Sequence, residues 1–348
     1  MKERTKETLR DGFGCLINNA AAMRGAKNGP LWLTIVMFIL SIFLPVVPLF
    51  VSQANVKGSS FLSSYSYGLE RYVTSMAMEL KDEGYKFGVN ENHLLSVSKD
   101  GNEINYADYG SKQPLKAYVD KTTGQYDFLL FVSESTSSSA QKAEYTAINS
   151  TYYAIGTTVV SETKDNAYLP SYMILFKNSV YVAIKYGTTA KANNPGGDYQ
   201  TIKASDDYLA TILTVKGKEG NEIAPSMYNA RYYNGVYANF KTFLNKSYET
   251  LRIKNMFTTS GIYLGIFTGV CILMGFLMWL LTRGKNNPNN YFSIWLCEKI
   301  QARLGLAPAL ITLVVGFFLT NYAAMIYILT IGLRVMWISM KELRPVQQ

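Results

Sequence analysis

The stretch "YMILFKNSVYVAIKY", residues Tyr172 to Tyr186, has the pattern of two extended, half-buried strands. β-branched and aromatic residues, which favour strands, fill both halves. Asn178-Ser179 lies between the halves and is expected to form a hairpin turn, although Asn-Ser is a weaker turn signal than Asn-Gly. Long apolar runs lie on either side of this region in the chain. The sequence therefore predicts a sheet-forming domain inserted between membrane helices.

Two of the apolar runs are predicted to cross the membrane. Leu31–Val51 is 21 residues long and Thr258–Thr282 is 25 residues long, and neither contains a charge. Each is long enough to cross about 30 Å of hydrocarbon as a helix. The first run is followed by "SQA" at Ser52–Ala54, which is similar to a signal cleavage site. We expect an anchor instead, because the run exceeds the usual signal core of about 7 to 15 residues and follows a 30-residue leader.

A third apolar region, residues 304–340, is too long for one crossing. It is 37 residues long and is interrupted by Arg334 and by the polar Thr320–Tyr322. The favoured interpretation is a hairpin of two short helices that turns near Asn321, with Arg334 extending to water at the inner surface. One tilted span that leaves the C-terminus outside is the alternative.

The distribution of charge predicts the orientation. Residues 1–30 carry six Lys/Arg against three acidic residues, and residues 283–348 carry seven against two. Residues 52–257 are nearly balanced, with 21 basic and 20 acidic residues. Because Lys and Arg accumulate on the cytoplasmic side of membrane helices, both termini are expected inside and the central domain outside. The net charge of +9 therefore reflects the Lys and Arg residues that flank the membrane helices. Nucleic acid is not an expected partner, because the central domain is nearly neutral.

These observations predict an α-helical integral membrane protein of about four spans with an inserted extracellular α+β domain. Its composition, 48% hydrophobic and 17% charged, fits a protein that lies partly in a membrane. The expected segments are a cytoplasmic basic segment (1–30), a span (31–51), the extracellular domain (52–257), a span (258–282), a cytoplasmic amphipathic segment (283–303), the helical hairpin (304–340) and a cytoplasmic tail (341–348).

The extracellular domain is expected to have helical ends and a mainly antiparallel sheet of at least five strands. Apolar residues recur at helical spacing from Leu62 to Leu80 and from Tyr228 to Leu251, which predicts two amphipathic stalk helices. Hairpins are expected around Asp100-Gly101 and around Gly124. Further predictions are a strand at Tyr152–Glu162 and polar loops at Ser133–Lys142 and Thr188–Gln200. The three cysteines, Cys15, Cys271 and Cys297, lie outside this domain, so it is expected to fold without disulfides.

Two segments that are predicted to be cytoplasmic each carry an apolar stripe at helical spacing. Such a stripe predicts a helix that lies at the membrane interface or docks on a partner. The first stripe consists of Phe13, Leu16, Ile17, Ala20 and Met23. The second consists of Phe292, Trp295, Leu296, Ile300 and Leu304.

No residue set in the sequence has the pattern of a catalytic, cofactor or metal site. His93 is the one histidine in the sequence, so it would be the sole imidazole ligand of a zinc site and the sole possible base of a serine triad. The favoured interpretation is a histidine in a turn or at the edge of a strand. The HExxH and GxxxxGK[ST] motifs are absent. Acidic candidates for a glycosidase pair are Asp120, Asp127, Asp206, Asp207, Glu219 and Glu222. We therefore predict a non-enzymatic protein without cofactors.

Tyrosine is abundant in the central domain, with 22 of the 26 residues between Ser52 and Phe257. Tyrosine stacks on sugars and packs in interfaces, but it is also a good strand residue. Because many of these tyrosines fall on the strand and helix periodicities, a structural role is favoured over a ligand platform.

The layout resembles a family of Gram-positive membrane proteins called maltodextrin utilisation proteins. The similar segments are "ELKDEGYKFGVNENHLLSVSKDG" (Glu79–Gly101), "AYVDKTTG" (Ala117–Gly124), "YMILFKNSVYV" (Tyr172–Val182) and "APALITLVVGFF" (Ala307–Phe318). The resemblance implies a non-catalytic accessory subunit of an ABC-type carbohydrate transporter, with a permease or another membrane protein as partner. The alternative is an envelope-facing receptor or sensor that binds a glycan or peptide through its Tyr-rich domain.

Overall fold

The computed structural model describes residues 10–62, 69–109, 113–119, 126–159 (backbone alone for 152–159), 171–184, 197–204, 206–284 and 287–343. The chain divides into two compact units. The helical unit contains the described residues up to Asn55 and from Lys254 on, and the sheet unit is Val56–Ile253. The sequence pattern had set these limits at residues 52 and 257.

The helical unit contains four helices that are long and apolar enough to cross a membrane. Its helices are α2 (Asn19–Asn28), α3 (Leu31–Ala54), α8 (Glu249–Leu281), α9 (Ile294–Leu304), α10 (Leu306–Phe318), the 3-10 turn η3 (Thr320–Tyr322) and α11 (Ala323–Lys341). The four candidate spans are α3, α8, the α9–α10 pair and the η3–α11 pair. This arrangement is compatible with a multi-pass membrane protein.

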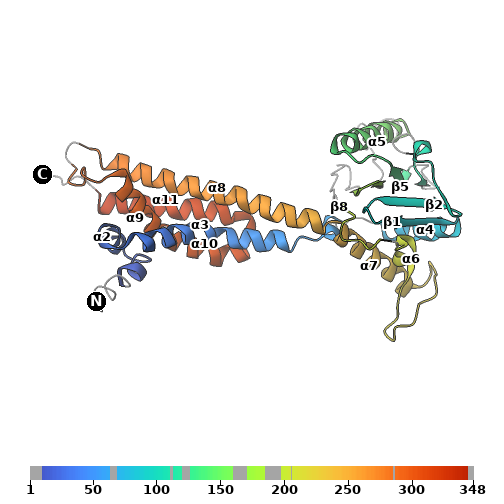
Figure 1. Ribbon diagram of the computed structural model, residues 1–348, viewed down its shortest axis with the longest axis horizontal. Helices are drawn as coiled ribbons and strands as arrows, with labels where there is room; N and C mark the ends of the chain where they lie inside the picture. Colours follow the sequence, from blue (N-terminus) through green and yellow to red (C-terminus); the bar gives the residue numbers. More distant parts are fainter. Residues whose placement is uncertain are drawn as a thin grey trace. The chain divides into compact units, whose positions relative to one another are not determined.

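The last apolar region forms two helices, as the favoured sequence interpretation expected. α10 and α11 pack against each other, and η3, which contains Asn321, forms the turn between them (Figure 1). The third candidate span begins at Ile294, ahead of the region 304–340 that was predicted to form the hairpin. α9 lies in the segment that was assigned to the cytoplasm, but it continues into α10 because Gly305 keeps a right-handed helical backbone and its N–H donates to the Gln301 carbonyl at 2.9 Å.

α3 and α10 approach closely because small residues face each other. An added Cβ on Gly305 would lie 3.0 Å from Ser41 Cβ, and one on Gly316 would lie 2.9 Å from Pro48 Cγ. Small residues at helix interfaces are typical of membrane proteins, where lipid tails are as apolar as leucine and close packing drives association.

The described residues of the sheet unit form two sheets and four helices. Its helices are α4 (Leu69–Asp82), α5 (Ser138–Val159), α6 (Tyr208–Leu213) and α7 (Ala230–Ser247), with 3-10 turns η1 (Gly58–Phe61) and η2 (Tyr106–Asp108). Its strands are β1 (Tyr85–Val89), β2 (Leu95–Lys99), β3 (Asn102–Glu103), β4 (Lys116–Val119), β5 (Tyr126–Ser133), β6 (Ser171–Phe176), β7 (Ser179–Ala183) and β8 (Gly197–Asp198).

The larger sheet has the strand order β4-β5-β6-β7-β8, and α5 covers one of its faces (Figure 1). β5 and β6 are parallel, and the other neighbouring pairs are antiparallel. A parallel pair needs a long crossover connection, and α5 lies in that connection. Both faces of β5 and β6 are covered, so their residues are buried without alternation.

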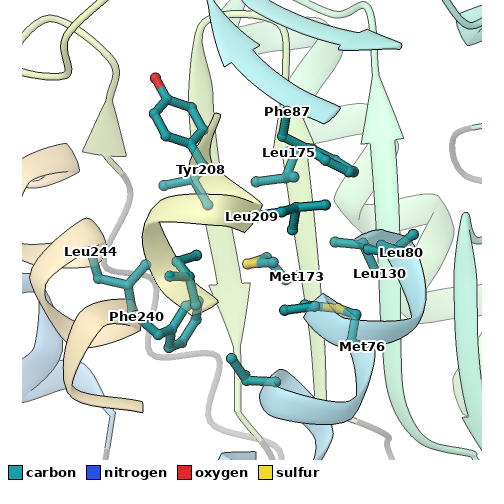
Figure 2. Close-up of a cluster of buried hydrophobic side chains, with 14 of the residues drawn as sticks. Met76, Leu80, Phe87, Leu130, Met173, Leu175, Tyr208, Leu209, Phe240 and Leu244 are labelled. Carbon is teal, nitrogen blue, oxygen red and sulfur yellow. The ribbon is translucent and has the colours of Figure 1, made fainter. Parts of the chain in front are cut away.

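The main core of the sheet unit lies on the face opposite α5. Figure 2 shows apolar side chains from helices and strands that meet there. The labelled residues are Met76 and Leu80 of α4, Phe87 of β1, Leu130 of β5, Met173 and Leu175 of β6, Tyr208 and Leu209 of α6, and Phe240 and Leu244 of α7. α4 and α7 therefore form a layer of the domain, and their predicted apolar stripes are buried against each other and against the sheet.

Local turn chemistry predicted the hairpins well. Asp100 (φ 52°) and Gly101 (φ 85°) form the two-residue turn between β2 and β3, with the positive φ at both positions that a type I′ turn requires. The β6–β7 hairpin is also present, but its turn is Lys177-Asn178, one residue earlier than predicted. The β4–β5 pair is confirmed, and the turn around Gly124 lies outside the described residues.

Two other predictions in the sheet unit were wrong. Residues 152–159, predicted as part of a strand, belong to α5, and the segment 133–142, predicted as a loop, contains the end of β5 and the start of α5. β-branched and aromatic residues favour strands locally. Here, however, β5 and β6 are parallel, and the connection between parallel strands is usually a helix. Of the predicted loop 188–200, residues 188–196 lie outside the described part of the chain.

Candidate functional site

Two of the acidic residues considered for catalysis have local structural roles, and Asp206 and Glu219 are exposed. Asp127 of β5 accepts a hydrogen bond from the Tyr72 hydroxyl at 2.7 Å. Asp207 caps α6, because its carboxylate accepts from the backbone N–H of Leu209 at 3.0 Å. Glu222 lies opposite Lys216 in a short loop bridge. Asp120 lies outside the described residues.

His93 lies in the turn between β1 and β2, as expected for the favoured interpretation. Its φ of 58° is in the left-handed region, and the side chain of Asn90 organises the turn by accepting from the N–H groups of Asn92 and Leu94. Within the described residues, no group of three or more His, Cys, Asp and Glu side chains is arranged to hold a metal ion.

The tyrosines of the sheet unit serve mainly as core residues. Tyr181 of β7 stacks on both Tyr145 of α5 and Tyr172 of β6, with centroid distances of 5.1 and 6.0 Å, respectively. Burial raises the pKa of the Tyr172 hydroxyl, which donates to Asn149 Oδ1 at 2.7 Å. Among the described tyrosines of this unit, Tyr228 alone is exposed. The core also holds an apolar cavity of about 30 Å³, far smaller than a ligand pocket.

In the helical unit, Arg334 bonds to two backbone carbonyls. Pro308 has no N–H, so the Leu304 carbonyl lacks its helical donor, and Arg334 Nη1 donates to that oxygen at 3.1 Å. Arg334 Nη2 donates to the Cys15 carbonyl. The guanidinium is 9% exposed, so the expectation that it extends to water is corrected: the protein itself supplies its acceptors.

A second buried arginine, Arg303 of α9, was not singled out from the sequence. It is fully buried and donates to Thr34 Oγ1 at 3.1 Å. Gly25 and Gly29 make room for it, since an added Cβ would lie 2.5 Å from Nη1 and 2.6 Å from Nη2, respectively. Its charge lies at the C-terminal end of α2, where helix carbonyls favour a cation.

The N-terminal segment is therefore held inside the unit on one side. Cys15 is fully buried, and burial raises the pKa of its thiol against the opposing charges of Arg303 and Arg334. Phe13 and Ile17 are 73% and 87% exposed. Of the second predicted stripe, Trp295 is exposed, whereas Phe292, Ile300 and Leu304 are buried. The first segment thus exposes or partly exposes its whole predicted stripe, whereas the second buries most of its stripe.

Polar side chains from four helices meet between α3, α8, α9 and α11. We call this set the polar seam, and it consists of Ser41, Cys271, Glu298, Gln301 and Tyr327. Cys271 Sγ lies 3.2 Å from Tyr327 Oη and interacts electrostatically with the other three side chains. Polar and ionisable groups on membrane helices are costly and mark functional sites by default.

The polar seam combines full burial with missing partners. Gln301 is fully buried, and among the described residues neither its Nε2 nor its Oε1 has a hydrogen-bond partner. Glu298 is partly buried, and its carboxylate lies against α8, where an added Cβ on Gly275 would lie 2.5 Å from Oε2. The sequence analysis missed both residues because their polarity had placed them in the cytoplasm; their three-residue spacing on one helix face was the available signal.

A different face of α8 carries three glycines with open space around them. Gly261, Gly265 and Gly269 recur every four residues, are exposed, and would have nothing within 4 Å of an added Cβ. Gly275 on the same helix, by contrast, is covered by Glu298. α8 is also the least covered candidate span: 22% of its most apolar window is buried, against 33 to 56% in the other three.

The chain matches no family model, no curated protein and no solved structure.

Proposed function

We propose that this chain is a non-catalytic integral membrane subunit that associates with another membrane protein through the open face of α8. The sheet unit lies outside the cell and both termini lie in the cytoplasm. The excess of Lys and Arg in residues 1–30 and 283–348 supports this orientation.

The observation that carries the proposal is the arrangement of small residues on α8. A glycine inside a helix costs about 1 kcal/mol relative to alanine. Gly275 offsets that cost by admitting a side chain of the same protein, whereas Gly261, Gly265 and Gly269 admit none in the described part of the chain. Thr258 is exposed one turn earlier on the same face. Close approach of a second helix backbone, which such faces favour in membranes, supplies the missing contact.

The class of partner comes from the resemblance to maltodextrin utilisation proteins. It supports a permease of an ABC-type carbohydrate importer as the protein whose transmembrane helix packs on α8. The alternative, a receptor with a Tyr-rich binding surface, receives less support, because the described tyrosines of the sheet unit other than Tyr228 are buried or partly buried.

Copurification of the tagged full chain in mild detergent tests the proposal. We expect a permease or its ATPase to accompany the wild-type chain, and Gly265→Leu with Gly269→Leu to reduce its recovery at least about tenfold, by analogy with packing-dependent helix pairs. Val314→Phe is the matched control, because it adds bulk to an exposed position on α10 (61% exposed).

Two results contradict the proposal. One is a wild-type chain that purifies with no membrane transport protein. The other is equal recovery of the partner with the double leucine variant and with Val314→Phe. Retention of the same resistance to detergent-induced unfolding shows that the variants are folded.

A further inference from the structure

The polar seam contains an acid and an amide on the same face of α9. Glu298 and Gln301 are one turn apart on α9, and their counterparts on α8, Gly275 and Cys271, are also one turn apart. The carboxylate lies over the backbone at Gly275, where no side chain separates it from α8. The acid and the amide thus share one interface between two candidate spans.

The amide group of Gln301 can donate through the two N–H bonds of Nε2 and accept through Oε1, and neither atom has a hydrogen-bond partner among the described residues. Gln301 is fully buried, and a buried polar atom without a hydrogen bond destabilises the fold. An ionised carboxylate only accepts hydrogen bonds, so it can pair with Nε2 and leaves Oε1 unpaired. A protonated carboxyl group has an O–H that donates to Oε1 while its carbonyl oxygen accepts from Nε2. The amide therefore pairs better with the protonated form of the carboxyl group than with its ionised form.

The charges around Glu298 do not compensate an ionised carboxylate. Among the described residues, no Lys or Arg lies within ion-pair distance of it. The titratable groups that face the pair are Cys271 of α8 and Tyr327 of α11, while α3 contributes Ser41, which carries no charge. On α9 itself, Cys297 and Lys299 are adjacent in sequence, and the Lys299 ammonium lies over the Trp295 ring, 5.9 Å from its centroid.

We propose that the polar seam is a proton-binding site, in which Glu298 takes up and releases a proton and Gln301 holds the protonated form by two hydrogen bonds. The proton comes from water and returns to it, and no other bond is made or broken. The site lies on a different part of α8 from the glycine face, so it stands independently of the partner proposed above.

Infrared difference spectroscopy on the full chain in lipid vesicles tests this site as the pH is raised across neutrality. We expect a carboxyl C=O stretching band that disappears as the acid ionises and that is lost in Glu298→Gln. Gln301→Leu, which keeps the acid, is expected to move the band to higher frequency, because the carbonyl loses its hydrogen bond. Glu342→Gln, at the end of α11, is the matched control and leaves the band unchanged.

Two results overturn the proposal. The first is a wild-type spectrum without a band that Glu298→Gln removes. The second is a band at the same frequency in Gln301→Leu and in the wild type, which would show that the amide does not hold the acid. The second comparison retains Glu298, so it remains decisive if Glu298→Gln fails to fold.

Discussion

Tyr199 in the sheet unit and Gln301 in the helical unit are both fully buried, but they differ in the hydrogen bonds of their polar atoms. The Tyr199 hydroxyl lies 3.1 Å from the Phe176 carbonyl oxygen and 2.9 Å from that of Ser179, and it donates to this pair across the β6–β7 turn. Both amide atoms of Gln301 lack hydrogen-bond partners in the part of the chain that the structure describes. The sheet unit thus uses a buried polar group to fix a turn at the edge of an apolar core, whereas the helical unit places polar groups between its helices.

The two units obtain their stability from different interactions. The sheet unit buries contiguous apolar side chains from helices and strands, as Figure 2 shows, and its stability follows from that packing. In the helical unit, lipid surrounds an already apolar surface, so close helix packing and buried hydrogen bonds matter more. Arg334 illustrates this, because it pairs a carbonyl that Pro308 leaves without a donor.

The largest expected effect is the loss of a core side chain in the sheet unit. Phe240→Ala removes a ring that is 1% exposed in the core of Figure 2 and is expected to destabilise this unit by about 3–5 kcal/mol. The urea dependence of proteolysis of the full chain measures the change. Tyr228→Ala, at a fully exposed ring, is the control, and a similar loss in both variants would contradict the apolar core as the source of stability.

A smaller effect is expected for Arg334→Met in the helical unit. The carbonyls of Leu304 and Cys15 lose their donor, which costs about 1–3 kcal/mol each, but removing a buried charge offsets part of the loss. We expect a net destabilisation of about 2 kcal/mol in detergent-induced unfolding, together with faster thiol labelling at Cys15.

Arg24→Met provides the control for the buried arginine. Arg24 lies in the same N-terminal segment but is exposed, and its contact with Asp11 is 3.4 Å long. Such surface pairs contribute at most about 1 kcal/mol. If Cys15 labelling rises equally in both variants, Arg334 does not hold the N-terminal segment.

The smallest expected effect is at the start of α6. Asp207→Ala removes the side-chain acceptor for the N–H groups of Leu209 and Ala210 and should cost about 1 kcal/mol. Asp207→Asn retains an N-cap acceptor and is expected to remain within a few tenths of the wild type. The same proteolysis assay distinguishes the two, and equal losses would show that the charge rather than the cap matters.

Local signals in the sequence predicted the hairpins and the apolar helices, but not the crossover or the polar seam. Asp100-Gly101 determines its turn by its own backbone preference, and Thr258–Thr282 is long and apolar wherever it lies. The end of α5, in contrast, depends on the parallel pairing of β5 with β6, which a single strand pattern does not contain. Glu298 and Gln301 were assigned to the cytoplasm because polarity alone cannot distinguish a solvated helix from one that buries polar groups.

The orientation of the sheet unit is the central claim, and cysteine accessibility on intact cells tests it most directly. Cys15, Cys271 and Cys297 are buried, so they should react little with a maleimide, and labelling should report on an added cysteine. We expect Tyr228→Cys to react with a membrane-impermeant maleimide on intact cells, and Lys341→Cys, exposed at the end of α11, to react only after the membrane is permeabilised. Labelling of Lys341→Cys on intact cells, or protection of Tyr228→Cys until permeabilisation, would contradict the account.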